Sequence, residues 1–471
     1  MKLSFPVHPR QKAALKTKAT EILYGGAAGG GKSHLFRVVA IGWCMAIPGL
    51  QVYLFRRESP DLWANHMEGP GSFPELLGPL LASKKVKINQ SKGFIEFPNH
   101  SKIHLCHCQY EKDKYAFQGA EIHVLLMDEL THFTPSIYRY LRARCRIGGL
   151  KVPERFQGMF PRILCGSNPG GAGHNWVKTA FVDLAPPMAI TQMPPREGGM
   201  LRQYIPAKLS DNPTVDAADY TMKLQGLGDD ALVKAMLDGD WDIVAGGMFD
   251  DVWRVQTHAV APFDIPASWR IDRSFDWGSS KPYSVGFWAE SDGTEATLAD
   301  GTKKAWPRGT LFRIAELYGW NGNPNEGCKK LAVEVARDIA AFQKVVPWGG
   351  RVKPGPADNS IYDAENGVCI ADDMAKLGIR WERSDKSPGS RKTGWEAMRR
   401  MFKAGHKHPM EEAGLFVFDT CRQFIRTVPT LPRDSKKTDD IDTDAEDHIA
   451  DEARYRVLAV RKTAAFHAVN F

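Results

Sequence analysis

A glycine-rich loop ending in lysine and serine follows the apolar run at residues 22–24. Its sequence, Gly26-Ala-Ala-Gly-Gly-Gly-Lys-Ser33, fits G-x-x-x-x-G-K-[ST] between a predicted strand and a predicted helix. Glycines let backbone N–H groups wrap a polyphosphate, and the next helix presents its positive N-terminal end. We expect Lys32 to neutralise the β- and γ-phosphates and Ser33 to bind Mg²⁺. The loop predicts ATP contacts at Gly26, Ala27, Ala28, Gly29, Gly30, Gly31, Lys32 and Ser33.

An acidic pair ends a second apolar run. Residues 124–127 are typical of a buried parallel strand, and Asp128 and Glu129 follow at its carboxyl end, where open α/β sheets bind ligands. Asp128 is expected to hold Mg²⁺ through a water molecule, and Glu129 to polarise the attacking water. Acids that merely end a strand in solvent are the alternative. Beside an intact phosphate loop, the pair predicts ATP hydrolysis.

Composition narrows the class of protein. The chain has 471 residues, enough for two or three domains, and its net charge of +7 suits a polyanionic partner. Eight scattered cysteines predict reduced thiols, and the histidines and cysteines at 100–108 are interpreted as a hairpin strand rather than a zinc site. The N-terminus lacks a signal-peptide core, and no run reaches transmembrane length. We therefore expect an intracellular protein with no membrane partner.

Strands and helices alternate through residues 1–200, as in a parallel α/β domain. The predicted strands are 21–24, 51–55, 94–97, 102–107, 122–127 and 161–165. Ser167 and Asn168 follow the last strand and are candidates for sensing the γ-phosphate, unless they simply form a Gly/Pro turn. Residues 201–248 are interpreted as a small helical lid or linker, and residues 249–471 as a second α/β domain.

The second domain opens with an antiparallel meander of strands at 271–276, 284–288 and 310–318. A helix is predicted at 325–345 with Leu331, Val335, Ile339 and Phe342 on one face, followed by a strand ending at Asp358 and by strands at 379–382 and 415–419. The closing helix is expected to carry Asp444, Asp447, His448 and Asp451 on one face.

This order of elements is that of a ribonuclease H-like nuclease. Asp276, Asp358 and Asp451 would converge, with Asp447 or His448 close by. Clustered carboxylates repel one another unless divalent cations lie between them, and two metals about 4 Å apart can cut a phosphodiester. The same acids could instead be loop residues and a solvated helix start. From the residues alone, both interpretations stay open.

The motifs together resemble the large terminase subunit of tailed bacteriophages and prophages. The resemblance spans nearly the whole chain and includes Phe5-Pro-x-x-Pro-x-Gln11, Gly26–Ser33, Phe117-Gln-Gly119, Leu126-Met-Asp-Glu129, Gly166-Ser-Asn-Pro169, Leu209-Ser-Asp-Asn-Pro213 and Gly239-Asp-Trp241. In the second half it includes Asp276-x-Gly278, Asp358, Lys386-x-x-x-Ser390-Arg391 and Asp447-His-Ile-Ala-Asp451-Glu-Ala-Arg454-Tyr455. Two departures are the extra glycines after Asn168 and the short context of Asp358, which leaves Asp363 as a rival.

The resemblance implies an ATP-driven motor that pumps double-stranded DNA into a procapsid, and a metal-dependent endonuclease that cuts the concatemer. It implies Mg²⁺, with Mn²⁺ as a substitute at a two-metal nuclease site, and partners that include the portal protein, a small terminase subunit and a ring of five copies in the host cell cytoplasm. Gln11 would recognise adenine and Asn168 would contact the nucleotide. Asp276, Asp358, Asp447 and Asp451 would bind metal.

Basic residues supply two further hypotheses. Arg142, Arg144 and Arg146 follow the acidic pair on a predicted helix, and one of them, with Arg144 slightly favoured, would act as an arginine finger on a neighbour's ATP. A basic face that touches DNA or solvent is an equal alternative for any one of them. Lys386, Arg391 and Lys392 are expected to bind the DNA backbone.

Two other functions compete with this interpretation. The first is a helicase or remodelling ATPase whose C-terminal half only binds DNA. The second is a nuclease whose ATPase acts as a regulatory gate. Only the terminase interpretation accounts for both sets of acidic residues in one chain.

Overall fold

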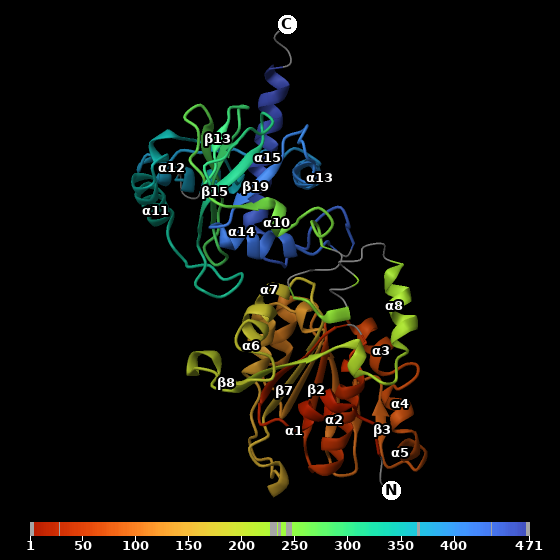
Figure 1. The fold of residues 1–471 in the computed structure, drawn as a ribbon. Coiled ribbons are helices and arrows are strands. Elements are labelled where there is room, and N and C mark those ends of the chain that lie inside the picture. Colours follow the sequence, from red (N-terminus) through yellow and green to blue (C-terminus); the bar gives the residue numbers. More distant parts are fainter. Residues whose placement is uncertain are drawn as a thin grey trace. The chain divides into compact units, whose positions relative to one another are not determined.

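The computed structural model describes residues 4–27, 29–226, 233, 237–241, 247–364, 368–434 and 436–467. The chain forms two compact units, Met1–Ala245 and Gly246–Phe471, each built around its own sheet (Figure 1). None of the helices in the described ranges combines the length and the apolar character that a membrane span requires.

A nine-stranded sheet forms the centre of the first unit. Its strand order is β3-β4-β5-β2-β6-β7-β1-β9-β8, and the strands from β5 to β9 in this order are parallel. The strands are β1 (Glu21–Gly26), β2 (Gln51–Arg56), β3 (Lys87–Asn89), β4 (Phe94–Glu96), β5 (Lys102–His107), β6 (Val124–Asp128), β7 (Arg162–Ser167), β8 (Ile190–Gln192) and β9 (Leu201–Ala207). All six predicted strands of this half therefore form, and β4 and β5 make the predicted hairpin.

Helices cover both faces of this sheet because its strands alternate apolar side chains between two cores. Ile22 and Tyr24 pack in the core that contains Leu35 and Phe36, whereas Leu23 packs in the other core with Ile137. The helices are α1 (Pro9–Lys16), α2 (Lys32–Ala46), α3 (Ser59–His66), α4 (Phe73–Leu76), α5 (Gly78–Ala82), α6 (Pro135–Arg142), α7 (His174–Val177) and α8 (Ala217–Gln225).

The interpretation of residues 201–248 as a helical segment is wrong for its first part. Residues Leu201–Ala207 form β9, which pairs in parallel with β1 inside the sheet. Four of its seven residues in a row, 202–205, are buried, so packing rather than the polar residues at 202 and 203 decides its conformation. The helical part that the structure describes here includes α8.

The second unit contains a mixed sheet of order β10-β19-β15-β12-β11-β17-β18, with β16 beside β11. The meander β11-β12-β15 is antiparallel, whereas β17 runs parallel to β11, and β19 parallel to β15. The strands are β10 (Ala259–Val260), β11 (Arg270–Asp276), β12 (Ser284–Glu290), β15 (Leu311–Tyr318), β16 (Val352–Lys353), β17 (Pro356–Ala357), β18 (Glu382–Arg383) and β19 (Leu415–Phe418), with β13 (Ala296–Thr297) and β14 (Lys303–Lys304) as a separate hairpin. The predicted fold class, a P-loop α/β domain and a ribonuclease H-like domain, is confirmed.

The helices of this unit are α10 (Val255–His258), α11 (Ala332–Val345), α12 (Ile370–Ala375), α13 (Ser390–Gly405), α14 (Arg422–Thr427) and α15 (His448–His467). Helix α15 lies against β11, β12 and β17, and α13 lies beside α15 (Figure 1). The helix predicted from residue 325 begins only at Ala332, so Leu331 precedes it and is 66% exposed, whereas Val335 and Ile339 are buried. The Leu331 N–H donates to Oε2 of Glu334 at 2.7 Å, which caps the first turn of the helix there.

Candidate active sites

The phosphate loop connects β1 to α2 at the carboxyl edge of the first sheet. Gly31 has φ +74°, and a Cβ there would lie 2.7 Å from Nε2 of Gln11, so both the backbone and the space require glycine. Gln11 donates from Nε2 to the carbonyl of Gly31 at 2.9 Å, and Tyr24 donates its hydroxyl to the carbonyl of Gly30 at 3.0 Å. The structure therefore places Gln11 against the loop backbone. Ala28 lies outside the described residues, whereas Ala27, Gly29 and Ser33 are in place.

Lys32 is buried and reaches the end of the neighbouring strand. Its Nζ donates to Oδ1 of Asn168 at 2.5 Å and to the carbonyl of Ala27 at 3.3 Å. Burial lowers the pKa of Lys32, and the nearby Glu129 and Asp128 oppose that shift. The proposed phosphate lysine and the proposed γ-phosphate sensor are therefore in direct contact.

Asp128 ends β6 beside β7 and is 1% exposed. Its Oδ2 lies 3.1 Å from Nε2 of His66 and 3.8 Å from Nε of Arg56. Burial alone would raise the pKa of Asp128, but the hydrogen bond and charge interaction with His66, and the charges of Arg56 and Lys32, lower it below its usual value. The carboxylate is thus held ionised at the strand end.

One oxygen of this carboxylate is left over. Oδ1 of Asp128 is buried and has no hydrogen-bond partner in the described part of the chain. A buried, unpartnered carboxylate oxygen is costly unless a cation or its water binds to it. Asp128, with the hydroxyl of Ser33 on the first turn of α2, therefore fits the Mg²⁺ that the phosphate loop implies.

The loop after Glu129 is tied to the end of β7. Glu129 has φ +55°, which places it in the left-handed region at the turn into Leu130–His132. Two residues later, the hydroxyl of Thr131 lies 2.8 Å from Oγ of Ser167, and the Thr131 N–H donates to the same oxygen at 3.2 Å. Ser167 and Asn168 thus connect the phosphate lysine to the segment that carries Glu129.

A second acidic site lies in the second unit at the end of β11. Nδ1 of His448 lies 3.3 Å from Oδ2 of Asp276, and the hydroxyl of Tyr455 lies 3.3 Å from the other oxygen, Oδ1. Burial raises the pKa of Asp276 to about 6; the hydrogen bond and charge of His448 oppose the shift, and the charges of Asp451 and Asp358 add to it. Strands β11 and β17 and helix α15 therefore bring Asp276, Asp358 and Asp451 close enough for their charges to interact.

Asp358 and Asp451 each have a basic partner. Asp358 follows β17, caps the turn at Asn359–Tyr362 and lies 3.3 Å from Nζ of Lys386. Oδ2 of Asp451 is 3.2 Å from Nη1 of Arg391, and its Oδ1 is 2.9 Å from Nη2 of Arg454. These contacts compensate the charges of Asp358 and Asp451 within the protein itself.

The start of α15 differs from its prediction. The helix begins at His448, so Asp444 and Asp447 precede it, and the Asp451 N–H donates to the carbonyl of Asp447 at 2.9 Å as the first helical bond. Asp447 still joins the cluster, 3.6 Å from NH2 of Arg391. Burial, with the charge of Asp451, raises the pKa of Asp447 to about 7. The backbone carbonyl of Asp444 accepts from Asn325 instead, at 3.3 Å.

The chemistry of these residues fits divalent cations, which prefer carboxylate oxygens and relieve their repulsion. The raised pKa values of Asp276 and Asp447 reflect buried acids that lack enough positive charge. However, among the described residues, no three histidine, cysteine or carboxylate groups are close enough to hold one ion as they stand. Tyr455 lies between Asp276 and Asp358, and Arg391 lies between Asp447 and Asp451.

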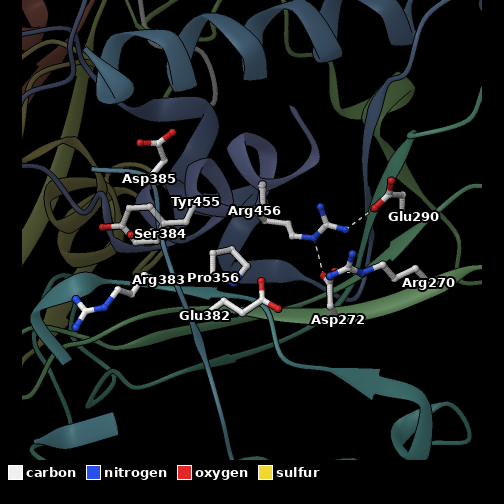
Figure 2. Close-up of a pocket in the computed structure, with 11 residues that line it drawn as sticks. Arg270, Asp272, Glu290, Pro356, Glu382, Arg383, Ser384, Asp385, Tyr455 and Arg456 are labelled. Carbon is white, nitrogen blue, oxygen red and sulfur yellow. Dashed lines mark hydrogen bonds and ion pairs between the residues drawn. The ribbon is translucent and has the colours of Figure 1, made fainter. Parts of the chain in front are cut away.

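Buried ion pairs fasten α15 to the sheet behind this site. Glu452 accepts hydrogen bonds from Ser274, Trp288 and Arg313, which come from β11, β12 and β15. On the same helix, Arg456 pairs with Asp272 at 2.5 Å and with Glu290 at 2.8 Å (Figure 2). A cavity of about 200 Å³ lies beside the Arg456 pairs. It is lined by Asp272, Glu290 and Arg456 together with Arg270, Pro356, Glu382, Arg383, Ser384, Asp385, Tyr455 and Ala459. Because Arg270 and Arg456 both pair with Asp272 in its lining, we interpret the cavity as part of the helix anchorage.

Comparison with known proteins finds one family that matches part of this chain. Residues 23–157 match the family described as the terminase large subunit, T4likevirus-type, N-terminal domain. This segment contains Gly26–Ser33, Asp128 and Glu129. This segment of the chain is similar to the N-terminal domain of large terminase subunits. The resemblance predicted from the motifs is thereby confirmed.

Solved terminase structures are similar at low identity. The large terminase of a thermophilic bacteriophage in complex with ADP is 16% identical, with a TM-score of 0.40, covering 96% of this chain and 98% of that one. The ATPase domain of the Thermus phage P74-26 large terminase is 14% identical, with a TM-score of 0.35, covering 51% of this chain and 95% of that one. The P22 large terminase nuclease domain is 15% identical, with a TM-score of 0.32, covering 46% and 98%. No curated protein matches the sequence.

The three arginines considered as a terminase arginine finger do not share one helix, because α6 ends at Arg142. Arg142 lies 3.3 Å from the buried Glu21. Arg144 donates to the carbonyl of Gln118 at 3.1 Å and lies 5.0 Å over the ring of Tyr140, whereas Arg146 is 3.7 Å from Glu121. The predicted helix is therefore wrong for Arg144 and Arg146.

The predicted DNA-binding residues also pair within the chain. Arg391 lies 2.6 Å from Asp440, and Lys392 lies 2.5 Å from Asp439. Lys386 contacts Asp358 and the hydroxyl of Tyr455, the latter at 2.9 Å. Lys386 and Arg391 thus belong to the acidic site itself, and Lys392 lies on the surface beside it.

Sequence reasoning missed two residues that contact the backbone of the phosphate loop. Asn212 donates from Nδ2 to the carbonyl of Gly29 at 2.7 Å, and a Cβ at Gly239 would lie 2.6 Å from the backbone of Gly26. Both belong to motifs noted in the sequence, Asp211-Asn-Pro213 and Gly239-Asp-Trp241, so a signal was present without a role. His66 gave no such signal, since a lone histidine in a helical stretch identifies no partner.

Proposed function

We propose that this protein is a viral DNA-packaging motor that uses ATP to translocate double-stranded DNA into a procapsid and cuts concatemeric DNA with a metal-dependent endonuclease. The observation that carries the proposal is the presence of two separate sites in one chain. The first is the loop with Lys32 and with Asp128 inside the terminase-family segment, together with Asn168, which follows that segment. The second is the acidic cluster of Asp276, Asp358, Asp447 and Asp451.

At the first site, the residues of the chain divide the work of ATP hydrolysis. The loop backbone and Lys32 bind the phosphates, Asp128 and Ser33 hold Mg²⁺, and Glu129 orients the water. Bound Mg²⁺ neutralises charge on the phosphates. A bound phosphate competes with Asn168 for the ammonium group of Lys32, so nucleotide state alters the contact at the end of β7. Ser167 and Thr131 pass that change to the segment after Glu129.

At the second site, Asp276, Asp358, Asp451 and Asp447 supply carboxylate oxygens for two cations, Mg²⁺ or Mn²⁺. Bound metal activates a water and stabilises the leaving oxygen. His448 and Tyr455 hold Asp276 in place, and Lys386 and Arg391 contribute positive charge toward the DNA phosphates. We further propose a ring of five copies on the portal, recruited with a small terminase subunit, in the host cell cytoplasm.

One assay separates the packaging motor from its rivals. Supercoiled plasmid is incubated with the protein and Mg²⁺ or Mn²⁺, with and without ATP, and ATP hydrolysis is measured in parallel. Cutting that needs metal but not ATP, together with separate ATPase activity, supports the proposal. Absence of cutting beside DNA-stimulated ATPase activity would instead support a helicase or remodelling enzyme. Cutting that occurs only with ATP would support a nucleotide-gated nuclease.

A further inference from the structure

A cavity of about 600 Å³ opens at the edge of the first sheet that lies opposite the phosphate loop. Thr20, Pro161 and Leu201 line it at the beginnings of the parallel strands β1, β7 and β9. The phosphate loop follows the other end of β1, which is six residues long. At about 3.3 Å per residue, the two edges are roughly 20 Å apart. A ligand of this cavity would therefore not be the hydrolysed nucleotide.

Guanidinium groups are concentrated at this cavity. Its lining includes Arg139 and Arg142, which belong to α6, and Arg196, which belongs to the turn Pro195–Glu197. Arg142 and Arg202 share one buried acid, Glu21, at 3.3 Å and 2.8 Å. The charges of Glu21 and Glu197 act on these guanidiniums, but neither acid lines the cavity, whose lining includes three arginines.

Crowding of like charges is visible at Arg139. Burial lowers the pKa of Arg139; the charge of Glu197 opposes the shift, and the charges of Arg142 and Arg202 add to it. Such an arrangement is unfavourable by itself, and an anion bound between the guanidiniums would relieve it.

Two glycines, Gly198 and Gly199, form part of the cavity lining near Arg142. Gly198 lines the cavity with φ +91°, a backbone conformation that side chains rarely adopt. A Cβ there would lie 3.4 Å from Cζ and Nε of Arg142. With Gly199 beside it, the segment leaves the guanidinium reachable from the cavity rather than covering it.

We propose that this cavity is a phosphate-binding site formed by Arg139, Arg142 and Arg196. Planar guanidinium groups bind phosphate oxygens in pairs of parallel hydrogen bonds, and three arginines that line one cavity favour a phosphate over a neutral ligand. The phosphate can come from the DNA backbone or from a small polyphosphate. The DNA source rests on the proposed function, whereas the small-anion source does not.

The test uses the full chain with Arg139→Gln and Arg196→Gln as separate variants. Arg142 is left unchanged because it neutralises Glu21. Arg155→Gln is the matched control, since Arg155 is an exposed arginine of the same unit whose guanidinium lies 4.7 Å over Phe156, outside the cavity. All variants carry Lys32→Ala as well, so that the phosphate loop does not dominate binding. Melting temperatures without ligand establish that each variant folds.

Two probes distinguish the sources. Pyrophosphate binding is measured by calorimetry, and binding of a short DNA duplex by fluorescence anisotropy over a range of salt. Losing one guanidinium contact should weaken pyrophosphate binding about tenfold. If DNA is the ligand, each variant should reduce the salt slope by about one unit.

Each outcome decides the proposal. Weaker binding of pyrophosphate alone supports a small-anion site, weaker binding of DNA alone supports a backbone contact, and weakening of both supports a site that accepts either. Binding of both probes equal to that of the Arg155→Gln control overturns the proposal. So does an effect confined to self-association, which would make this an interface between copies. ATP hydrolysis and plasmid cutting are measured on protein that keeps Lys32, so failure here is distinct from failure of the packaging function.

Discussion

The hydroxyl of Tyr455 lies 3.1 Å from Oδ2 of Asp358. The same hydroxyl is 3.3 Å from Oδ1 of Asp276, so one proton serves two carboxylates. Nζ of Lys386 lies 2.9 Å from it. Helix α15 thus places a neutral donor between two acids that would otherwise repel, and Lys386 adds the compensating charge.

Replacing this tyrosine tests its place in the acidic site. Tyr455→Phe keeps the ring but removes the donor, so the metal-free protein should lose about 1–3 kcal/mol of stability. Mn²⁺ should restore part of it, because a cation takes over the role of the proton. Thermal unfolding in EDTA and in Mn²⁺ measures both effects. Tyr362→Phe is the control, since its ring contacts Arg383 rather than the acids; equal losses in the two variants would contradict the assigned role.

Single Asp→Asn changes at positions 276, 358 and 451 should nearly abolish plasmid cutting, because each removes a ligand charge. Asp276→Asn should have the largest effect and should lose most of the thermal stabilisation by Mn²⁺. ATP hydrolysis should survive all three changes, since the phosphate loop belongs to the other unit. Asp363→Asn is the matched control for the exposed rival acid. Retained cutting with unchanged Mn²⁺ shifts would leave the three acids a structural role only.

Glu129→Gln should bind ATP with Mg²⁺ but lower kcat by about 100-fold or more, because the amide cannot polarise the attacking water. Lys32→Ala should abolish hydrolysis as well, by removing the cation for the phosphates. Steady-state phosphate release and nucleotide affinity separate the two effects. Glu154→Gln, an exposed acid of the same unit, should behave as wild type. A wild-type rate for Glu129→Gln would remove this residue from the mechanism.

Substitutions of Arg142, Arg144 and Arg146 should have different effects, because the three side chains have different partners. Arg142→Ala should lower the melting temperature of its own subunit, because it leaves the buried Glu21 with one fewer cation. Arg144→Ala should leave the melting temperature unchanged. If Arg144 acts on a neighbour's ATP, its variant subunits doped into wild-type assemblies should depress ATPase activity more than their mole fraction. The same doping with Arg142→Ala and with Arg146→Ala tests the two rival arginines, and a strictly proportional loss for Arg144→Ala would reject the trans role.

The salt dependence of DNA binding should distinguish Lys392 from Arg391. Lys392 is 69% exposed and pairs with the exposed Asp439, so Lys392→Ala should reduce the salt slope by about one unit if it contacts a phosphate. Arg391 contacts Asp440, Asp447 and Asp451, so Arg391→Ala should also alter Mn²⁺ stabilisation. Anisotropy titrations with Lys407→Ala as an exposed control measure the slope. An unchanged slope for Lys392→Ala would place it in solvent.

Local signals were sufficient for the parallel core of the first unit. Short apolar runs with glycine or acids at their ends predict strands such as β1 and β6, because a strand buried on both faces needs apolar residues at successive positions. Local signals were weaker at the polar-rich β9, which is a strand because it fills the space beside β1. They were also imprecise at Asp447, which precedes α15 rather than lying on it.

The sequence by itself determined the phosphate loop, the acids that end β6 and β11, and the order of strands that brings distant acids together, because these depend on residue type and short spacing. Only the tertiary structure decided which partner each charged group takes. Arg142 pairs with Glu21, at a sequence separation of 121 residues. Arg391 pairs with Asp451 and His66 with Asp128, at separations of 60 and 62 residues. Such contacts depend on how buried charges find compensation in the folded chain, which no local pattern records.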